Sequence, residues 1–263
     1  GYVLLLEPLR LFVRARAQAA PLVVALAMVF SLVPSTGGAA DRTDVPLKNW
    51  GGFAVSRDAV YDDLERLVTA GLGDRTVLNT KPLSRTEAAR IVARAIEIIR
   101  RDELGRFNER RDLEVVLDRL IEEFRVELAA LGVRTPGSAA STPGFFSFVP
   151  VDRAQVFNGY ANHRTLFVNS QGAGFRRGFN SGTTFESRAQ IGDFLSFYLQ
   201  PQLLRNADYG ALRLATGYLK LTLFNVELAV GRESLWWGPG FRNSLLLSNN
   251  ALPLDQVRVG TAE

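Results

Sequence analysis

The residues TTFESRAQI at positions 183–191 alternate between side chains that are apolar or small and side chains that are polar. The same alternation returns in FLSFYLQPQLL at 194–204 and in LRLATGYLKLTL at 212–223, with turn residues at Gly192-Asp193 and Phe224-Asn225. A period of two is that of a β-strand, because successive side chains point to opposite faces of a sheet. The sequence therefore predicts long antiparallel strands with one apolar face and one polar face.

The second half of the sequence contains six such segments. Strands of about 9–11 residues with one lipid-compatible face are typical of outer-membrane β-barrels, which need no fewer than about eight strands. We therefore expect a partial barrel, in a chain that is a truncated piece of a longer reading frame. A soluble β-sandwich alternates in the same way and is the alternative interpretation. The predicted strands lie near 153–163, 182–191, 194–204, 212–223, 225–234 and 254–262.

The first 40 residues have the composition of a secretory signal peptide. Three arginines precede an apolar run at 21–33, and small residues follow that run up to Ala40, after which we expect cleavage. The run is shorter than the roughly 20 residues that cross a bilayer as a helix. An uncleaved anchor helix is the alternative.

The rest of the chain changes in composition at its middle. Residues 41–135 contain 17 basic and 18 acidic side chains, whereas residues 136–263 contain only 11 basic and 8 acidic ones. Between the two parts, the segment 132–144 (GVRTPGSAASTPG) has the composition of a linker. The sequence thus predicts an α+β protein, with a helical domain at 41–131 and a partial antiparallel outer-membrane β-barrel at 145–263.

Residues 41–131 have apolar side chains at helical spacing. Apolar residues recur at helical spacing after Ser56, and Gly71 is suited to end that helix. Ser84-Arg85-Thr86-Glu87 has the spacing of a capping box and predicts the start of a second helix. A third helix is predicted from about Asn108 to Leu131, with an apolar stripe and charges on its other faces. A helical bundle is the favoured interpretation of this pattern and a short coiled coil is the alternative.

The chain has no cysteine and one histidine, His163. It therefore lacks the residues for disulfides, thiol catalysis and thiolate metal sites, and we expect neither a metal site nor a cofactor. Glu227 and Glu233 are spaced to face one side of a strand, as a carboxylate pair for glycoside hydrolysis would be. Polar residues facing a barrel lumen are the favoured interpretation, so we predict a protein that is not an enzyme. The net charge of +4 is modest and no basic tract indicates binding to nucleic acid.

The densest motif of the chain is GRESLWWGPGFRNSLLLSNNA at 231–251, in which two adjacent tryptophans precede Gly-Pro-Gly at the end of a predicted strand. Indole rings bind the C–H faces of sugars, while arginine and asparagine side chains hydrogen-bond to sugar hydroxyls. Tryptophan also anchors barrels at the membrane–water interface or packs a loop into the lumen. A structural role is therefore the alternative to contact with a glycan.

This motif closely resembles the signature of the capsule assembly Wzi family of outer-membrane proteins. Upstream, Val45-Pro46-Leu47 and the run KPLSRTEAAR at 81–90 are similar to the helical N-terminal region of such proteins and to an S-layer-homology unit. The resemblance implies an outer-membrane β-barrel of a Gram-negative-type bacterium, with its helical domain in the periplasm. It also implies a lectin-like role, in which the protein binds and retains capsular or exported polysaccharide at the cell surface.

Five residues are candidates for contact with that polysaccharide. Arg232, Trp236 and Trp237 lie in the motif. Arg176 and Arg177 lie in a polar, Gly-rich stretch (NSQGAGFRRGFNSG) that we expect to form an extracellular loop. Two adjacent arginines suit an acidic polysaccharide, and an ordinary solvated loop is the alternative.

The expected partners are capsular or exported polysaccharide, outer-membrane lipid and, through the helical domain, a cell-wall polymer. A porin-like channel that the helical domain tethers to the cell wall is the alternative function. A periplasmic β-sandwich enzyme is a third class, and such a protein would stay soluble without detergent.

Overall fold

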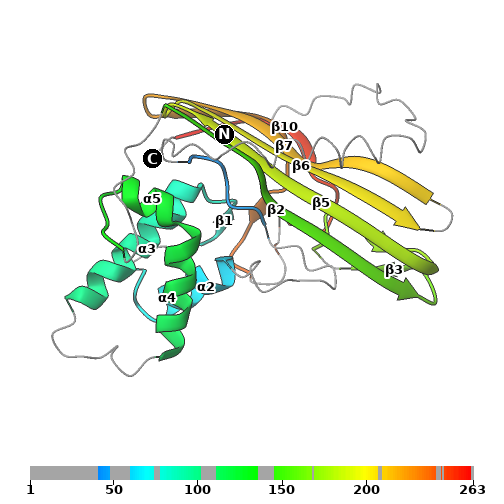
Figure 1. Ribbon diagram of the computed structural model, residues 1–263, viewed down its shortest axis with the longest axis horizontal. Helices are drawn as coiled ribbons and strands as arrows, with labels where there is room; N and C mark the ends of the chain where they lie inside the picture. The colour runs from blue at the N-terminus through cyan, green and yellow to red at the C-terminus, as the bar shows by residue number, and fades with distance from the viewer. Residues whose placement is uncertain are drawn as a thin grey trace.

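The computed structural model describes residues 41–47, 60–73, 78–101, 111–135, 145–167, 169–206, 209–240, 244 and 246–261. The predicted signal peptide, residues 1–40, and residues 136–144 of the predicted linker lie outside the described residues. The helices gather at one end of a sheet whose long strands extend away from them (Figure 1).

The helices form a bundle with an apolar core of its own. They are α2 (Val60–Thr69), α3 (Arg85–Arg100), α4 (Arg111–Glu123) and α5 (Arg125–Ala130). The predicted capping box starts α3, where Ser84 Oγ accepts a hydrogen bond of 3.1 Å from the backbone N–H of Glu87. Among the described residues, no helix is both long and apolar enough to cross a membrane. The fully buried core side chains are Leu64, Leu67, Leu72, Ala88, Ala89, Val92, Ala95, Phe124 and Leu128.

The prediction of one helix up to Leu131 is wrong, because the chain breaks at Phe124 between α4 and α5. Phe124 has φ −107° and ψ 22°, which is outside the helical region. The cause lies on α3, where the guanidinium of Arg85 donates a hydrogen bond of 2.5 Å to the carbonyl oxygen of Glu123. In an unbroken helix that oxygen accepts from the backbone N–H four residues later. A side chain that inserts into this ladder kinks the helix.

Six strands form one antiparallel sheet in the order β10-β8-β7-β6-β5-β2. This result confirms the predicted mixture of helices and antiparallel strands. The described strands form an open sheet with β2 and β10 at its edges, so closure into a barrel remains a prediction. Two short pairs lie outside this sheet, β1 (Thr80–Lys81) with β9 (Trp236–Trp237) and β3 (Thr165–Leu166) with β4 (Gly174–Phe175). The long strands are β2 (Phe146–Ala161), β5 (Gly178–Ile191), β6 (Leu195–Asn206), β7 (Tyr209–Leu223), β8 (Val226–Glu233) and β10 (Leu254–Thr261).

The first long strand starts earlier than predicted. β2 begins at Phe146, not near 153, and its pairing with β5 shifts between Val149 and Arg153. A bulge adds a residue to one strand and interrupts the alternation of side chains. The sequence before the bulge therefore lacks the regular period by which the later strands were recognised.

The second long strand also starts earlier, because β5 begins at Gly178 inside the stretch 169–182 that was expected to be a loop. Gly182 pairs with Phe157 of β2, and a Cβ on Gly182 would lie 2.0 Å from the Phe157 ring. Glycine at this position allows a ring to approach the backbone closely and does not mark a turn.

The six-stranded sheet buries its polar face and exposes its apolar face. On β5, Thr184 and Glu186 are only 5% and 4% exposed, whereas Leu199 on the other face of β6 is 51% exposed. In a soluble protein the apolar face of a sheet lies on the core instead. The exposed apolar side chains of the long strands include Val156, Phe179, Phe197, Leu199, Leu212, Leu214, Leu219, Leu223, Val230 and Val259.

Candidate functional site

The N-terminal segment 41–47 lies between the helices and the polar face of the sheet. The Asp44 carboxylate forms an ion pair with Lys220 of β7 and accepts a hydrogen bond of 2.9 Å from Arg258 of β10. On its other side, Asp44 forms an isolated β-bridge with Ser84, the residue that caps α3. The segment therefore joins the sheet to the start of a helix.

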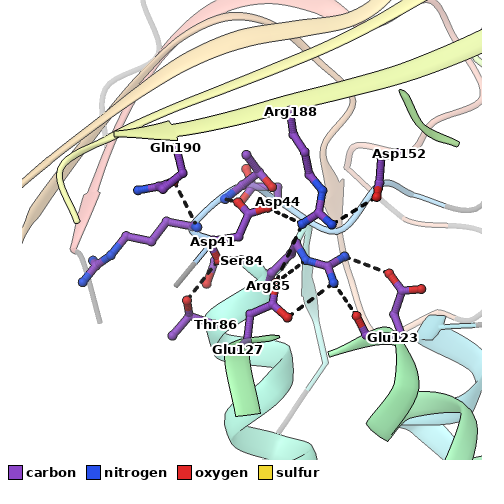
Figure 2. A network of polar contacts seen from close by, with 12 residues as sticks. Asp41, Asp44, Ser84, Arg85, Thr86, Glu123, Glu127, Asp152, Arg188 and Gln190 are labelled. Carbon is purple, nitrogen blue, oxygen red and sulfur yellow. Dashed lines mark hydrogen bonds and ion pairs between the residues drawn. The ribbon is translucent and has the colours of Figure 1, made fainter. Parts of the chain in front are cut away.

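Asp41 extends this contact into a chain of alternating charges, shown in Figure 2. Its carboxylate pairs with Arg188 of β5, which also lies 3.0 Å from Asp152 of β2 and 3.8 Å from Glu127 of α5. Glu127 in turn accepts a hydrogen bond of 2.6 Å from Arg85 of α3. We call this set of side chains the ionic junction, and it comprises Asp41, Asp44, Arg85, Glu127, Arg188, Lys220 and Arg258.

The cations of the ionic junction keep its two aspartates ionised. Burial by itself would raise the pKa of Asp41, but the charges of Arg188 and Arg85 outweigh it, so the pKa lies below its usual value. Burial would also raise the pKa of Asp44, and its two strand cations again hold that pKa below its usual value. At neutral pH the junction therefore consists of charged pairs.

The first half of the 231–251 motif contacts the helical part of the chain. β9 pairs with β1, so that Trp236 lies opposite Lys81. Trp236 is 4% exposed, and the Lys81 ammonium lies 5.8 Å from its ring centroid and 5.0 Å from that of Tyr61 in α2. An ammonium over two aromatic rings is attracted by both. These contacts link the motif to the bundle.

The second half of the motif fixes the connection between β2 and β5. The backbone carbonyl oxygens of Asn249 and Asn250 accept hydrogen bonds of 2.7 and 3.0 Å from the N–H groups of Gln171 and Gly172. The side-chain oxygen of Asn250 accepts another, of 3.0 Å, from the N–H of Asn169. The motif therefore bridges the helical part and this connection.

A cavity of about 340 Å³ lies on the polar face, beside the same connection. Phe157, Phe167 and Phe175 form an aromatic cluster in its lining, with the Phe175 ring centroid 6.0 Å from that of Phe157 and 4.9 Å from that of Phe167. Pro46 and Leu47 also line the cavity, which therefore adjoins the segment of the ionic junction. Its volume falls within the range of about 300–1,000 Å³ that is usual for ligand pockets.

Polar side chains of β5 and β6 line the cavity as a hydrogen-bonded row. The amide of Gln200 donates to Glu186 at 3.2 Å, and the amide of Gln202 donates to Thr184 Oγ1 at 3.1 Å. Arg213 donates to the side-chain oxygen of Gln202 at 2.6 Å. Among the described residues, the side-chain oxygen of Gln200 and one of its amide hydrogens have no partner. Gln200 therefore offers both an acceptor and a donor to a ligand.

The five residues predicted to contact polysaccharide do not form one site. Trp236 is buried against β1, while Trp237 is 36% exposed. Arg232 makes two hydrogen bonds, of 2.6 and 2.7 Å, to an aspartate of β10. Arg176 and Arg177 are exposed in the connection between β2 and β5. None of the five is among the described residues that line the cavity.

Sequence reasoning missed the cavity and the ionic junction. Gln200 and Gln202 follow the period of β6 and were recognised as polar-face residues, but the period does not show what covers that face. One usable signal was present, because Arg188, Lys220 and Arg258 are cations within the predicted strands. Buried charges need partners, and the acidic segment after Ala40 supplies them.

The two glutamates considered as a carboxylate pair face the same side of β8, as their spacing predicts. Glu227 and Glu233 lie 3.6 and 3.5 Å from Arg258, which also binds Asp44. Both carboxyl groups thus lie beside a cation of the sheet. His163 is exposed in the connection between β2 and β5.

Comparison with known proteins found a family similar to most of the sheet-forming part of the chain. Residues 154–263 match the family model described as capsule assembly protein Wzi. Outer membrane protein SlpA of Deinococcus radiodurans is 37% identical over 92 residues, which are 35% of this chain and 7% of that relative. The chain thus spans only a small part of the length of that relative. No solved structure matches.

The match includes most of the residues that line the cavity and the whole of the 231–251 motif, whereas Pro46, Leu47 and Arg153 of the lining lie outside it. The resemblance predicted from that motif is therefore confirmed. From residue 154 to residue 263, this chain is similar to the family of capsule assembly protein Wzi.

Proposed function

We propose that this protein works in capsule assembly at the outer membrane, where it binds and retains capsular or exported polysaccharide without catalysing a reaction. The similarity of residues 154–263 to capsule assembly protein Wzi supports this role. The relative from Deinococcus radiodurans is an outer membrane protein by name, which supports the location.

The sheet with its apolar face exposed is the observation that carries the proposal of a membrane location. Leu199 and Leu219 alternate along their strands with polar side chains, and Lys220 beside Leu219 is buried. A strand with this pattern loses little by facing lipid, whereas in water the same face is an aggregation hazard. In lipid the edges β2 and β10 require further pairing, because unpaired backbone groups cost several kcal/mol there. A closed barrel provides that pairing.

The lengths of the connections support an orientation. The turns at 192–194 and 224–225 are short and lie at the end of the sheet where the helices gather, whereas β2 and β5 are joined by the long connection 162–177 at the other end (Figure 1). Outer-membrane barrels have short turns on the periplasmic side and long loops outside. We therefore assign the helical domain, 41–131, to the periplasm.

Retention of polysaccharide fits the polar face better than conduction does. Segment 41–47 and the residues after β8 contact this face and leave a bounded cavity next to it. A porin requires a continuous water-filled lumen. The cavity lining, with amides, hydroxyls and phenylalanine rings, instead has the chemistry that binds sugars.

A charge on the apolar face tests the membrane location. Leu219→Arg should prevent stable insertion, because arginine at mid-depth on the lipid face of a barrel costs about 2–4 kcal/mol. Val126→Arg is the control, since Val126 is also exposed, at 49%, but lies in the helical bundle. The amount of each variant in purified outer membranes is the measurement. If Leu219→Arg were found in the outer membrane in the same amount as Val126→Arg, the proposed membrane location would be contradicted.

Retention is tested with the full-length protein in detergent and the surface polysaccharide purified from the producing cells. We expect the immobilised protein to hold the polysaccharide through washing, and the protein in planar bilayers to show no stepwise conductance. A protein that conducts ions but retains no polysaccharide would contradict this proposal and support the porin-like channel instead.

A further inference from the structure

We infer that the cavity beside β5 and β6 is the place where this protein holds one sugar ring of its polysaccharide. This inference rests on the proposed function and assigns a site to it. A sugar ring presents apolar C–H faces and an edge of hydroxyl groups, so its site needs an apolar wall and a row of donors and acceptors. The cavity has both. Its apolar wall comes from β2 and the connection between β2 and β5, and its row of donors and acceptors comes from β5 and β6.

The row of donors and acceptors is already ordered. Gln200 is held by its bond to Glu186, and Gln202 is held between Thr184 and Arg213. Glu186 and Gln202 are each only 4% exposed, so their positions are fixed by the surrounding sheet. The free side-chain oxygen of Gln200 can accept a hydrogen bond from one sugar hydroxyl, and its free amide hydrogen can donate to the neighbouring hydroxyl. A site that is ordered before binding loses little entropy when the ligand arrives.

The apolar wall is also fixed in place. The Phe157 ring lies over Gly182, where any side chain would displace it, and Phe175 packs against the same ring. The connection that carries Phe167 and Phe175 is tied down by the backbone of Asn249 and Asn250. The C-terminal half of the 231–251 motif therefore shapes the site, and none of its described residues lines the cavity.

Size limits what the cavity accepts. At about 340 Å³ it lies near the lower end of the usual range of about 300–1,000 Å³ for ligand pockets. One ring of a long chain fits such a volume, and the neighbouring rings continue outside it. Retention of a long polysaccharide then comes from a weak site that many repeats of the same chain occupy in turn.

The test uses short oligosaccharides prepared by partial acid hydrolysis of the surface polysaccharide, with binding measured by calorimetry on the full-length protein in detergent. Gln200→Met keeps the length of the side chain and removes its hydrogen bonds, and we expect its affinity to fall about tenfold. Phe157→Leu reduces the apolar wall and should weaken binding similarly. Phe179→Leu is the matched control, because Phe179 lies on the opposite face and is 57% exposed.

The outcomes separate this inference from the proposed function. Wild-type protein that retains the whole polysaccharide while Gln200→Met and Phe157→Leu bind oligosaccharides as tightly as wild type would overturn the inference alone. If Phe179→Leu lost as much oligosaccharide affinity as the two cavity variants, the inference would also be overturned, because the effect would then not depend on the cavity. Wild-type protein that retains no polysaccharide would overturn the proposed function itself. Gln200→Met decides if Phe157→Leu fails to assemble in the membrane.

Discussion

At Gly231 the backbone of β8 has a φ of +150°, a region that residues with a Cβ rarely adopt. A Cβ at this position would lie 2.3 Å from the carbonyl oxygen of Gly217 and 2.6 Å from the Cα of Tyr218. Tyr218 in turn accepts a hydrogen bond of 2.6 Å from the backbone N–H of Asp44. The glycine at the start of the motif therefore sets how closely β8 approaches a strand that holds the N-terminal segment.

Gly231→Ala should lower the free energy of unfolding by about 1–3 kcal/mol, because the added Cβ meets backbone atoms and the φ is strained. Gly210→Ala is the matched control, since nothing lies within 4 Å of a Cβ built on Gly210 in the adjacent strand β7. Urea-induced unfolding in detergent micelles measures both. Equal stability of the two variants would contradict the close approach described for Gly231.

For single residues, the sequence predicted which face of a strand a side chain occupies, but not its partner. The alternation assigned Arg188 and Lys220 to the polar face, where the structure has them. Their partners, Asp41 and Asp44, lie 147 and 176 residues away along the chain. A local pattern carries no information about such contacts.

At the level of helices and strands, regular elements were predicted well and their interruptions were not. Both interruptions come from contacts across the fold, since Arg85 breaks the third helix at Phe124 and a bulge against β5 offsets the start of β2. Phe124 itself belongs to the apolar stripe and is fully buried. The stripe therefore predicted the burial of Phe124 correctly, although its last member, Leu131, is 37% exposed and the backbone departs from one helix.

Arg85 of α3 contacts Glu123 of α4 and Glu127 of α5. Arg85→Gln should therefore lower the free energy of unfolding by about 3–5 kcal/mol. The substitution leaves the Glu127 carboxylate, which is 1% exposed, without the partner that lies 2.6 Å away. Arg94→Gln removes an exposed ion pair of the same helix α3 and should leave stability nearly unchanged. Thermal unfolding followed by circular dichroism compares the two, and similar melting temperatures would argue against a buried ion pair at Arg85.

For the whole molecule, the ionic junction makes the attachment of the bundle to the sheet dependent on pH. The pKa values of Asp41 and Asp44 are lower in the folded protein than in the unfolded chain, where the pKa of an aspartate is about 3.9. Their contribution to stability is therefore fully present above that value and is lost as the pH falls through the lowered folded value. Neutral and mildly acidic conditions should leave the junction intact.

Asp44→Asn tests this dependence. At pH 7 the variant should be less stable than wild type by about 3 kcal/mol, because Lys220 keeps its burial and loses its nearest anion. Below about pH 4 the wild type should lose stability more steeply than the variant, so that the two converge. Melting temperatures between pH 7 and pH 3 are the measurement. Two curves that stay parallel over this range would show that Asp44 does not titrate as described.

The bond between Asp44 and Arg258 spans 214 residues, from the first described segment to the last described strand. The N-terminal end of a chain is synthesised first, yet this contact is among the last that can form, because β10 must already be paired. The bundle, whose core comes from nearby residues, can fold long before it is attached. Contacts of such sequence separation slow folding. We therefore expect the helices to reach their final position only after the six described strands have paired, so that their attachment reports the pairing of β10.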